Sequence, residues 1–405
     1  MNLYLLIFLL LAAGTLSERR CPGTKEKVYW VCWGASAVCL CLRFGQGTDY
    51  VTYHAIYETI PTVVDLSQGY IFGFFPEPGW RLICALFKLC HAPFWVFTMA
   101  LGAADMLLLH RFLQKYAPLK TAGLFLSYPA LYIVWMVSGL RQGLAMCLFL
   151  GILVPFYLEK KWGRYVAGVL IAASFHKVGY GWLVLPAVYY LPMEAMLALT
   201  GLSAAGGLIL QAGAVEQFFV RLIPAYHVKQ FLLEGSISIF ATGERLLSFG
   251  VLTVLYIWNR KKDGQADKRT ELLLKAYMCG TCFYMLLCGS SYYASRYGVI
   301  FKVLECAVVM GLIQGRELPA RAAAAFFFAL TLLMGYKNLN AMISEGGYAG
   351  AGISVWNFPY VSVFNQDRIE AYRPYGRLLE ERYEDNIGDQ QLWMIEDTER
   401  TRNAP

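Results

Sequence analysis

Residues 121–143 read TAGLFLSYPALYIVWMVSGLRQG, and this stretch decides the fold class. Its first part, residues 121–137, contains no charged side chain. A helix of about 20 apolar residues crosses a bilayer, because it satisfies its own backbone hydrogen bonds in lipid. A short polar turn follows at residues 138–142, and a second apolar run then reaches the basic residues Lys160, Lys161 and Arg164. Two membrane spans joined by a tight turn are therefore predicted.

The same alternation of apolar blocks and short basic clusters runs through the chain of 405 residues. The chain is 58% hydrophobic and only 16% charged, with a mean hydropathy of +0.45. Soluble proteins are about 45–50% apolar and about a quarter charged. The short alternating segments of a transmembrane β-barrel are absent. We therefore predict an all-α integral membrane protein with about 12 transmembrane helices, outer loops and an amphipathic or re-entrant helix at residues 81–91.

Lysine and arginine clusters set the predicted orientation. Five of the six predicted inner loops carry at least two of these residues, as expected for cytoplasmic loops, and the N-terminus is then outside. Residues 165–176 and 178–191 are predicted as the sixth and seventh spans. Long outer loops are predicted at residues 43–80 and 213–244.

Two units follow from this topology. Residues 1–336 are predicted to form a polytopic transmembrane domain, and residues 337–405 an outward-facing C-terminal segment that ends in a polar, acidic tail. A short amphipathic helix is predicted in this tail around Leu378, Leu379, Leu392 and Trp393.

Several function classes are excluded. The net charge of +7 does not indicate a nucleic-acid partner, because the basic residues flank apolar blocks and form no separate basic domain. The sequence contains no Walker A loop, no HExxH metal motif, no GxSxG elbow and no DxD pair. No metal and no cofactor are expected.

The first candidate motif is RFGQGTDY, residues 43–50, where the second span meets the outer surface. The planar guanidinium of Arg43 suits phosphate, and Asp49 can accept a proton or hold that arginine. The tyrosines that follow share one face of a helix and are suited to a sugar: Tyr50, Tyr53 and Tyr57. An interfacial arginine, an N-capping aspartate and an aromatic belt explain the same pattern equally well.

Two further motifs place arginines at outer span ends. SGLRQG, residues 138–143, contains Arg141 and Gln142, and SSYYASRY, residues 290–297, contains Tyr293 and Arg296. The positive-inside rule does not explain arginines on the outer side. Together with Arg43 they suit a lipid diphosphate, because arginine binds phosphate oxygens bidentately. The alternative is that each side chain only extends toward the membrane surface.

The fourth motif is ASFHKVG, residues 173–179, in which His176 ends a span on the outer side. Histidine can act as a general base near neutral pH. A single histidine on an apolar helix is more often structural. Of the two outer groups that can accept a proton, we favour His176 as base and Asp49 as an orienting group for Arg43 or the acceptor sugar.

These motifs together resemble one family. The run GQGTDYVTY (residues 45–53), followed in order by EPGW (77–80), SGLRQGLAM (138–146), SFH (174–176) and RY (296–297), resembles EpsG-type, Wzy-like polysaccharide polymerases. The resemblance extends over about residues 1–365. It implies polymerisation of oligosaccharide repeat units carried on undecaprenyl diphosphate, in exopolysaccharide or capsule biosynthesis. A GT-C-like helical fold belongs to the same expectation.

The resemblance also implies the chemistry: an inverting, metal-independent glycosyl transfer at the outer leaflet of the bacterial cytoplasmic membrane. Its diphosphate leaving group would be neutralised by the outer arginines. Other assembly proteins, such as a flippase and a chain-length regulator, are the expected partners. The predicted catalytic residues are His176, Asp49 and Arg141, and the predicted substrate-binding residues are Arg43, Tyr50, Tyr53, Gln142, Tyr293 and Arg296.

Three other functions stay open. The first is a glycosyltransferase that uses a polyprenyl monophosphate sugar, or a ligase to another acceptor. The second is a flippase for lipid-linked oligosaccharides, which would place its charges at mid-membrane depth rather than at outer span ends. The third is a membrane scaffold, which would tolerate loss of these charges.

Overall fold

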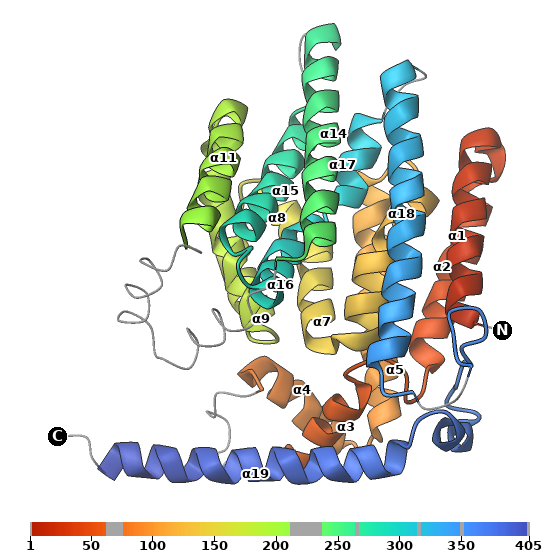
Figure 1. The fold of residues 1–405 in the computed structure, drawn as a ribbon, viewed down its shortest axis with the longest axis vertical. Helices are drawn as coiled ribbons and strands as arrows, with labels where there is room; N and C mark the ends of the chain where they lie inside the picture. The colour runs from red at the N-terminus through yellow and green to blue at the C-terminus, as the bar shows by residue number, and fades with distance from the viewer. Residues whose placement is uncertain are drawn as a thin grey trace.

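The computed structural model describes residues 2–61, 76–210, 237–263, 267–313, 317–348 and 352–402, and Figure 1 shows most of their helices side by side in one bundle. Within these ranges the regular structure is helical, apart from one isolated β-bridge. The helices of the first half are α1 (Leu3–Arg20), η1 (Pro22–Thr24), α2 (Lys25–Leu42), α3 (Tyr50–Thr59), α4 (Pro78–Leu89), α5 (Phe94–Tyr116), α6 (Lys120–Ser127), η4 (Tyr128–Ser138), α7 (Leu140–Leu148), η5 (Phe149–Leu153), α8 (Val154–Leu158), α9 (Trp162–Ala173), η6 (Lys177–Val184), α10 (Leu185–Tyr190) and α11 (Met193–Leu210). Those of the second half are α14 (Ile239–Asp263), α15 (Lys268–Leu286), α16 (Ser291–Lys302), α17 (Glu305–Leu312), α18 (Leu318–Glu345), η7 (Gln366–Ala371) and α19 (Tyr375–Arg402).

Six continuous helical segments in the described residues are long and apolar enough to cross a membrane: Phe94–Tyr116, Lys120–Ser138, Leu140–Leu158, Met193–Leu210, Ile239–Lys262 and Leu318–Glu345. The second and third of them are the two spans predicted from residues 121–143. The helix α6 continues into the π-helical η4, and α7 continues through the π-helical η5 into α8. The all-helical membrane class is confirmed, whereas the full set of about 12 spans stays a prediction.

Some predicted boundaries are wrong. The sixth and seventh spans are short, because α9 has 12 residues and the next segment divides into a 3₁₀ helix of eight residues and a helix of six. Each is shorter than the about 20 residues of a straight span. The last span runs on to Glu345, nine residues beyond its predicted end at residue 336.

The predicted outer loops also contain helices. Residues 43–80 include α3 and the start of the amphipathic α4, while residues 62–75 lie outside the described residues. The second loop was predicted to end at residue 244, but α14 already begins at Ile239, and residues 211–236 lie outside the described part. The tail helix is long rather than short, because α19 covers 28 residues.

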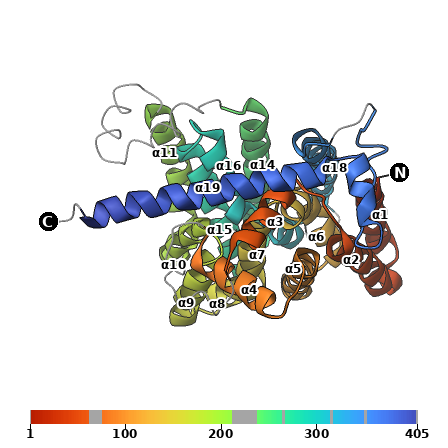
Figure 2. The ribbon, with the colours of Figure 1, turned by 90° about the horizontal axis from the view of Figure 1, so that it is seen from below.

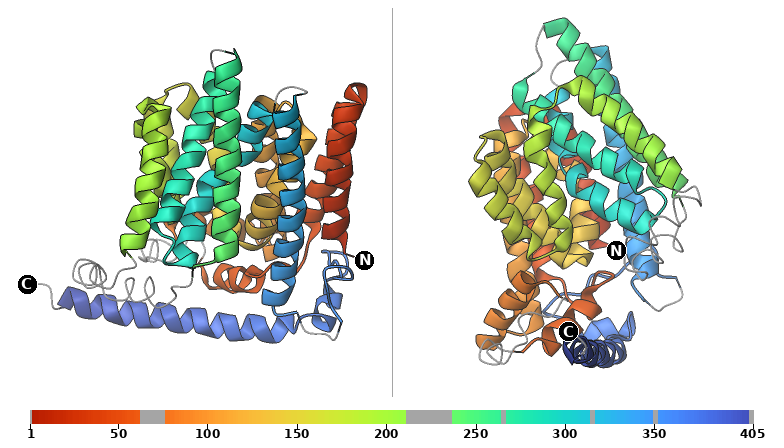
Figure 3. Two further views of the ribbon diagram at one scale, coloured as in Figure 1. Left: turned by 45° about the horizontal axis from the view of Figure 1, so that its top comes forward. Right: turned by 90° about the vertical axis from the view of Figure 1, so that its left-hand side faces the viewer.

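One end of the bundle carries α3, α4 and α19, and the first turn of α1 lies near it (Figure 1). The helix α19 lies across the ends of the bundle helices, as the left view of Figure 3 shows, and α3 lies beside it in Figure 2. A hydrogen bond of 2.5 Å between His54 Nδ1 and the Tyr375 hydroxyl joins these two helices. We call this the α3–α19 end of the bundle.

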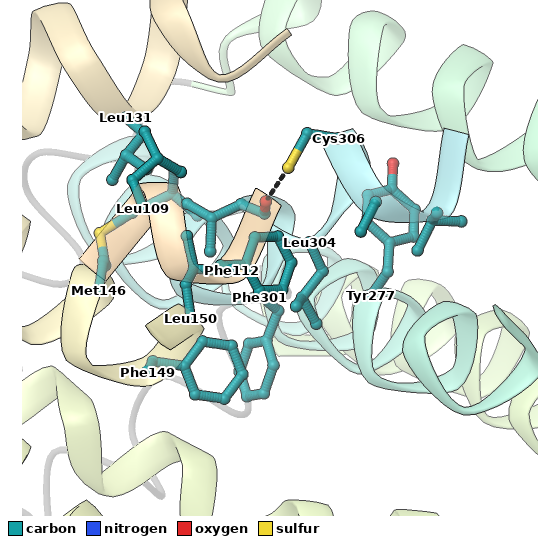
Figure 4. Packing of buried hydrophobic residues seen from close by; sticks show 14 of the residues in the cluster. Leu109, Phe112, Leu131, Met146, Phe149, Leu150, Tyr277, Phe301, Leu304 and Cys306 are labelled. Atoms are coloured by element: carbon teal, nitrogen blue, oxygen red, sulfur yellow. Dashed lines mark hydrogen bonds between the residues drawn. The ribbon is translucent and has the colours of Figure 1, made fainter. Parts of the chain in front are cut away.

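The core between the helices is packed with apolar side chains, as Figure 4 shows around Leu109, Phe149 and Phe301. All three are fully buried. The ring of Phe149 stacks on Trp182 at a centroid distance of 4.5 Å, which ties the π-helical segment η5 to the 3₁₀ helix η6. Local polar caps add to this packing: Asn2 accepts hydrogen bonds from Tyr4 N and Leu5 N at the start of α1.

Two native cysteines can test the orientation of the helix bundle in the membrane. Cys90 follows α4 at the α3–α19 end, Cys21 follows α1 at the opposite end, and both are exposed. If the α3–α19 end faces outward, a membrane-impermeant maleimide should label Cys90 in intact cells and Cys21 only after permeabilisation. The variants Cys90→Ser and Cys21→Ser assign the two signals. Labelling of both cysteines from the same side would contradict the orientation.

Candidate functional site

The RFGQGTDY motif forms a loop between α2 and α3. Its backbone conformation requires glycine at two positions. Gly45 has φ 68° and Gly47 has φ 114°, in the region that side chains with a Cβ avoid. A Cβ on Gly47 would lie 2.5 Å from the carbonyl oxygen of Val137. The glycines therefore let the loop, which we call the glycine loop (residues 43–49), pass directly over the end of η4.

Three distant parts of the chain hold the glycine loop in place. The Arg373 guanidinium donates to the carbonyl oxygens of Gly45 at 2.9 Å, Gly47 at 3.0 Å and Thr48 at 3.1 Å. Thr48 N–H donates to Ser138 Oγ at 3.2 Å. Gly47 N–H donates at 3.0 Å to the hydroxyl of Tyr348, and the ring of that tyrosine lies under the Arg373 guanidinium. The loop is thus fixed before any substrate arrives.

Asp49 ends this loop and is the residue before α3. Its side chain makes no capping hydrogen bond to the helix and reaches solvent. The protein packed around the carboxyl limits its hydration and raises its pKa above the ordinary value of 3.8, although Thr48 donates a hydrogen bond that opposes the shift. The charges of Arg296 and Arg141 also act to lower this pKa. Asp49 therefore lies in the field of two predicted arginines.

Arg43 is separated from that cluster. Its side chain is 1% exposed, and its guanidinium donates to the carbonyl oxygens of Leu40 at 2.5 Å and Met136 at 3.0 Å. These carbonyls end α2 and η4, where helices have acceptors without an intrahelical donor. Its contacts hold two helix ends together, and the predicted role in phosphate binding has no support in this geometry.

Arg141, at the start of α7, forms a buried ion pair with Glu77. The other carboxylate oxygen of Glu77 accepts a hydrogen bond of 3.1 Å from Lys177 N–H. The guanidinium lies over the ring of Tyr53, 5.7 Å from its centroid. Arg141 is thus the meeting point of four segments: α3, the start of α4, α7 and the turn after α9.

A close backbone approach supports this meeting point. Gly79 N–H donates to the carbonyl oxygen of Ser174 at 2.8 Å, and a Cβ on Gly79 would lie 2.9 Å from the same carbonyl oxygen and would also meet Ser174 Oγ. Only glycine at position 79 lets the EPGW segment pack against the turn that carries His176.

His176 is buried beside these arginines. Its Nδ1 accepts a hydrogen bond of 3.3 Å from Val178 N–H, so the neutral ring carries its proton on Nε2. Burial, together with the charges of Arg141 and Arg296, lowers the pKa of His176 to about 3. Such a ring is neutral but accepts a proton poorly. The geometry therefore disfavours our prediction that His176 is the base.

Gln142 and Arg296 connect α7 with α16. Gln142 Nε2 donates to the carbonyl oxygen of Arg296 at 3.3 Å. The Arg296 guanidinium lies 3.9 Å from the ring centroid of Tyr292, and no carboxylate among the described residues pairs with it. Tyr293, three residues before Arg296, is half-buried and lies in the first turn of α16. Arg296 is thus a partly exposed cation beside Asp49 and His176.

The tyrosines predicted to stack on sugar lie in one helix, as expected, but they face inward. Tyr50 is fully buried and meets Phe94 edge-on at 5.1 Å, while Tyr53 is 6% exposed below Arg141. Their contacts in this structure are packing contacts, and Tyr53 shields one face of the arginine.

Sequence reasoning missed two site residues, Glu77 and Arg373. Both are buried, and both act on groups far away in the sequence. The EPGW motif was the only signal for Glu77, and Arg373 lies in the tail, where no motif pointed to it. Among the described residues no three His, Cys, Asp or Glu side chains lie close enough to hold a metal ion.

The glycine loop gives a stability prediction. Gly47→Ala should destabilise the protein by about 1–3 kcal/mol, because φ 114° and the Val137 carbonyl both oppose a Cβ. Thermal unfolding in detergent measures this effect. Gly163→Ala is the control, because a Cβ on Gly163 meets nothing within 4 Å. Equal melting temperatures for the two variants would show that the loop is not fixed as described.

The fold and the site define a class of protein. It is an α-helical membrane protein in which a buried arginine, a partly exposed arginine and an accessible carboxylate meet at one end of the helix bundle. The chain belongs to the EpsG family, whose model matches residues 28–352. This range includes Asp49, Glu77, Arg141, His176 and Arg296 and ends before Arg373. No curated protein and no solved structure matches the chain, so a GT-C-like fold stays a prediction.

Proposed function

We propose that this protein is a membrane glycosyltransferase that polymerises lipid-linked oligosaccharide repeat units at the outer leaflet of the bacterial cytoplasmic membrane. The observation that carries the proposal is the position of Asp49, an accessible carboxylate in the field of Arg141 and Arg296. A base next to fixed cations suits a transfer in which a hydroxyl loses a proton while a phosphate leaves. Membership in the EpsG family supports a polymerase-like role.

The reaction would run in one displacement. The acceptor hydroxyl oxygen attacks the anomeric carbon of the donor sugar, and the bond from that carbon to the undecaprenyl diphosphate oxygen breaks. The diphosphate leaves with the electron pair, and the hydroxyl proton passes to Asp49. Attack opposite the leaving group inverts the anomeric carbon. No metal or cofactor has a part in this scheme.

The two arginines have different tasks. Arg296 has no carboxylate partner among the described residues and is partly exposed, so it can bind the diphosphate directly. Arg141 is held by Glu77 and Tyr53, so its guanidinium has a fixed position behind the site and acts from there on Asp49. His176 donates from Nε2 in its neutral form, which suits a diphosphate oxygen. We propose Gln142 and Tyr293 as further substrate contacts, because Gln142 bonds to the backbone of Arg296 and Tyr293 lies one helical turn before Arg296 on α16.

The flippase alternative predicts charges at mid-depth that face a cavity. The described residues do contain a deep charged cluster: Lys302, at the end of α16, pairs with Glu244 at 2.6 Å and Glu305 at 2.7 Å. Arg245 lies 3.8 Å from the other carboxylate oxygen of Glu244, so two cations and two carboxylates offset one another. Glu244 is buried and Lys302 and Glu305 are partly buried, as expected for a structural network. We therefore favour the enzyme.

Purified protein in liposomes with lipid-linked repeat units tests the proposal. We expect polymer longer than one unit, with release of undecaprenyl diphosphate in proportion to the bonds formed. Transfer from a polyprenyl monophosphate sugar alone would favour the first alternative. Movement of the lipid-linked unit between leaflets without a new glycosidic bond would favour the flippase.

The pH dependence distinguishes the two candidate bases. A base works only when deprotonated, so activity should fall as the pH drops through the pKa of the base. For Asp49 this acid limb should lie above 3.8, because the protein packed around its carboxyl limits hydration and raises the pKa. For His176 it would lie near 3. The measurement is the initial rate of polymer formation against pH, with protein integrity checked after each exposure.

A further inference from the structure

A cavity of about 350 Å³ lies at the end of the bundle opposite Asp49, between α1, α6, α17 and α18. Its walls are almost entirely apolar and include Leu16, Phe125, Val309 and Phe327. Such a volume is within the range of small-ligand pockets, which is about 300–1,000 Å³.

Two arginines complete the lining of this cavity. Arg19 is in the last turn of α1 and Arg321 in the first turn of α18, and Figure 1 shows that these helix ends lie at the same end of the bundle. Both side chains are exposed, and neither has an ion-pair partner among the described residues. Two uncompensated cations at the edge of an apolar cavity suit an amphiphile with an anionic head.

The acids nearest to these arginines along the chain do not pair with them. Glu317, four residues before Arg321, forms an ion pair with Lys262, and Glu18, next to Arg19, is held by the backbone of α6. Glu18 is buried, and its two carboxylate oxygens accept hydrogen bonds from Thr121 N–H at 3.2 Å and Ala122 N–H at 3.1 Å. The carboxylate thus caps the first turn of α6 and fixes α1 against it. The wall of the cavity is preformed, and the positive charge stays directed outward.

We propose that this cavity binds one anionic glycerophospholipid of the inner leaflet, with its phosphate on Arg19 and Arg321 and an acyl chain between α6 and α18. The positive-inside rule accounts for basic residues at this end of the bundle but not for an apolar cavity next to two of them. The paired arginines favour a lipid with net negative charge over a zwitterionic one. The site is independent of the proposed transferase activity.

Native mass spectrometry of the full-length protein tests the proposal. The protein is titrated in detergent with phosphatidylglycerol and, separately, with phosphatidylcholine of the same chain length. We expect one tightly retained phosphatidylglycerol and at least about tenfold weaker retention in the double variant Arg19→Gln/Arg321→Gln. The matched control is Arg20→Gln/Arg111→Gln, which removes two exposed arginines from the same end without changing the cavity lining.

A second variant tests the acyl chain. Ala325 is an exposed cavity residue on α18, so Ala325→Phe fills the cavity with little risk to folding and should abolish retention while both arginines remain. Glycerol phosphate at the same concentration should not compete, because it lacks a chain. The proposal is overturned if both double variants retain phosphatidylglycerol equally, if phosphatidylcholine binds as tightly, if glycerol phosphate competes, or if a polyprenyl diphosphate is retained instead.

Discussion

Replacing Asp49 with Asn should slow polymer formation by roughly 10²–10⁴-fold, the usual contribution of a general base. The amide cannot take the proton from the acceptor hydroxyl. Since the Asp49 side chain makes no capping hydrogen bond and reaches solvent, the variant should fold and insert normally. The measurement is the initial rate with purified lipid-linked repeat units, at equal amounts of protein in the liposomes.

Asp367→Asn provides the matched control, because Asp367 is an exposed acid of η7 on the tail segment that leads to Arg373. Its rate should equal that of the wild type. A second comparison is His176→Gln, which keeps a side-chain donor and should therefore lose much less activity than Asp49→Asn. If His176→Gln loses the larger factor and Asp49→Asn retains activity within a few-fold, the base assignment is reversed.

Much of the membrane architecture could be predicted from the sequence because its signal is local. The apolar run at residues 121–137 and the polar turn after it became two helical spans that meet at Gly139. The helical spacing of Tyr50, Tyr53 and Tyr57 also appeared as one helix, α3. The spacing of these tyrosines could not show whether their face of α3 points into the protein or toward a substrate, because aromatic residues suit both a packed interior and a binding surface.

Site residues that depend on long-range pairing could not be found in this way. Glu77 meets Arg141 across 64 positions, and Arg373 reaches the glycine loop across more than 320. An acid before a Pro-Gly pair reads as an ordinary helix start. An arginine in a polar tail, such as Arg373, is expected to be a solvent-exposed charge. The roles of Glu77 and Arg373 become visible only in the folded protein, where both charged side chains are buried against their partners.

The prediction for His176 shows how burial changes chemistry. The ordinary pKa of histidine, about 6.5, made His176 a better candidate base than Asp49 when only the sequence was considered. In the fold its Nδ1 lone pair is used by Val178 N–H, and burial with two nearby arginines makes protonation unfavourable. Asp49 is affected in the opposite sense, because the surrounding protein limits the hydration of its carboxyl, raises its pKa and so strengthens it as a base.

The ion pair between Glu77 and Arg141 is expected to give the largest stability effect. Both side chains are about one-tenth exposed, and removing one member of a buried pair typically costs about 3–5 kcal/mol, because it leaves a buried charge without this counter-ion. Glu77→Gln should therefore lower the unfolding free energy by about this amount. Glu194→Gln is the control, since its pair with Arg260 is exposed and its loss should not change stability measurably.

A double-mutant cycle separates stability from catalysis at this pair. Glu77→Gln/Arg141→Gln replaces two charges with two amides that can bond to each other, so its destabilisation should be clearly smaller than the sum of the single effects. Activity should not recover, because the guanidinium that acts on Asp49 from behind the site is gone. Unfolding in detergent and polymerisation rates are measured on the same preparations. Additive unfolding free energies would show that the two side chains do not act as a pair, and restored polymerisation in the double variant would show that Arg141 serves the fold alone.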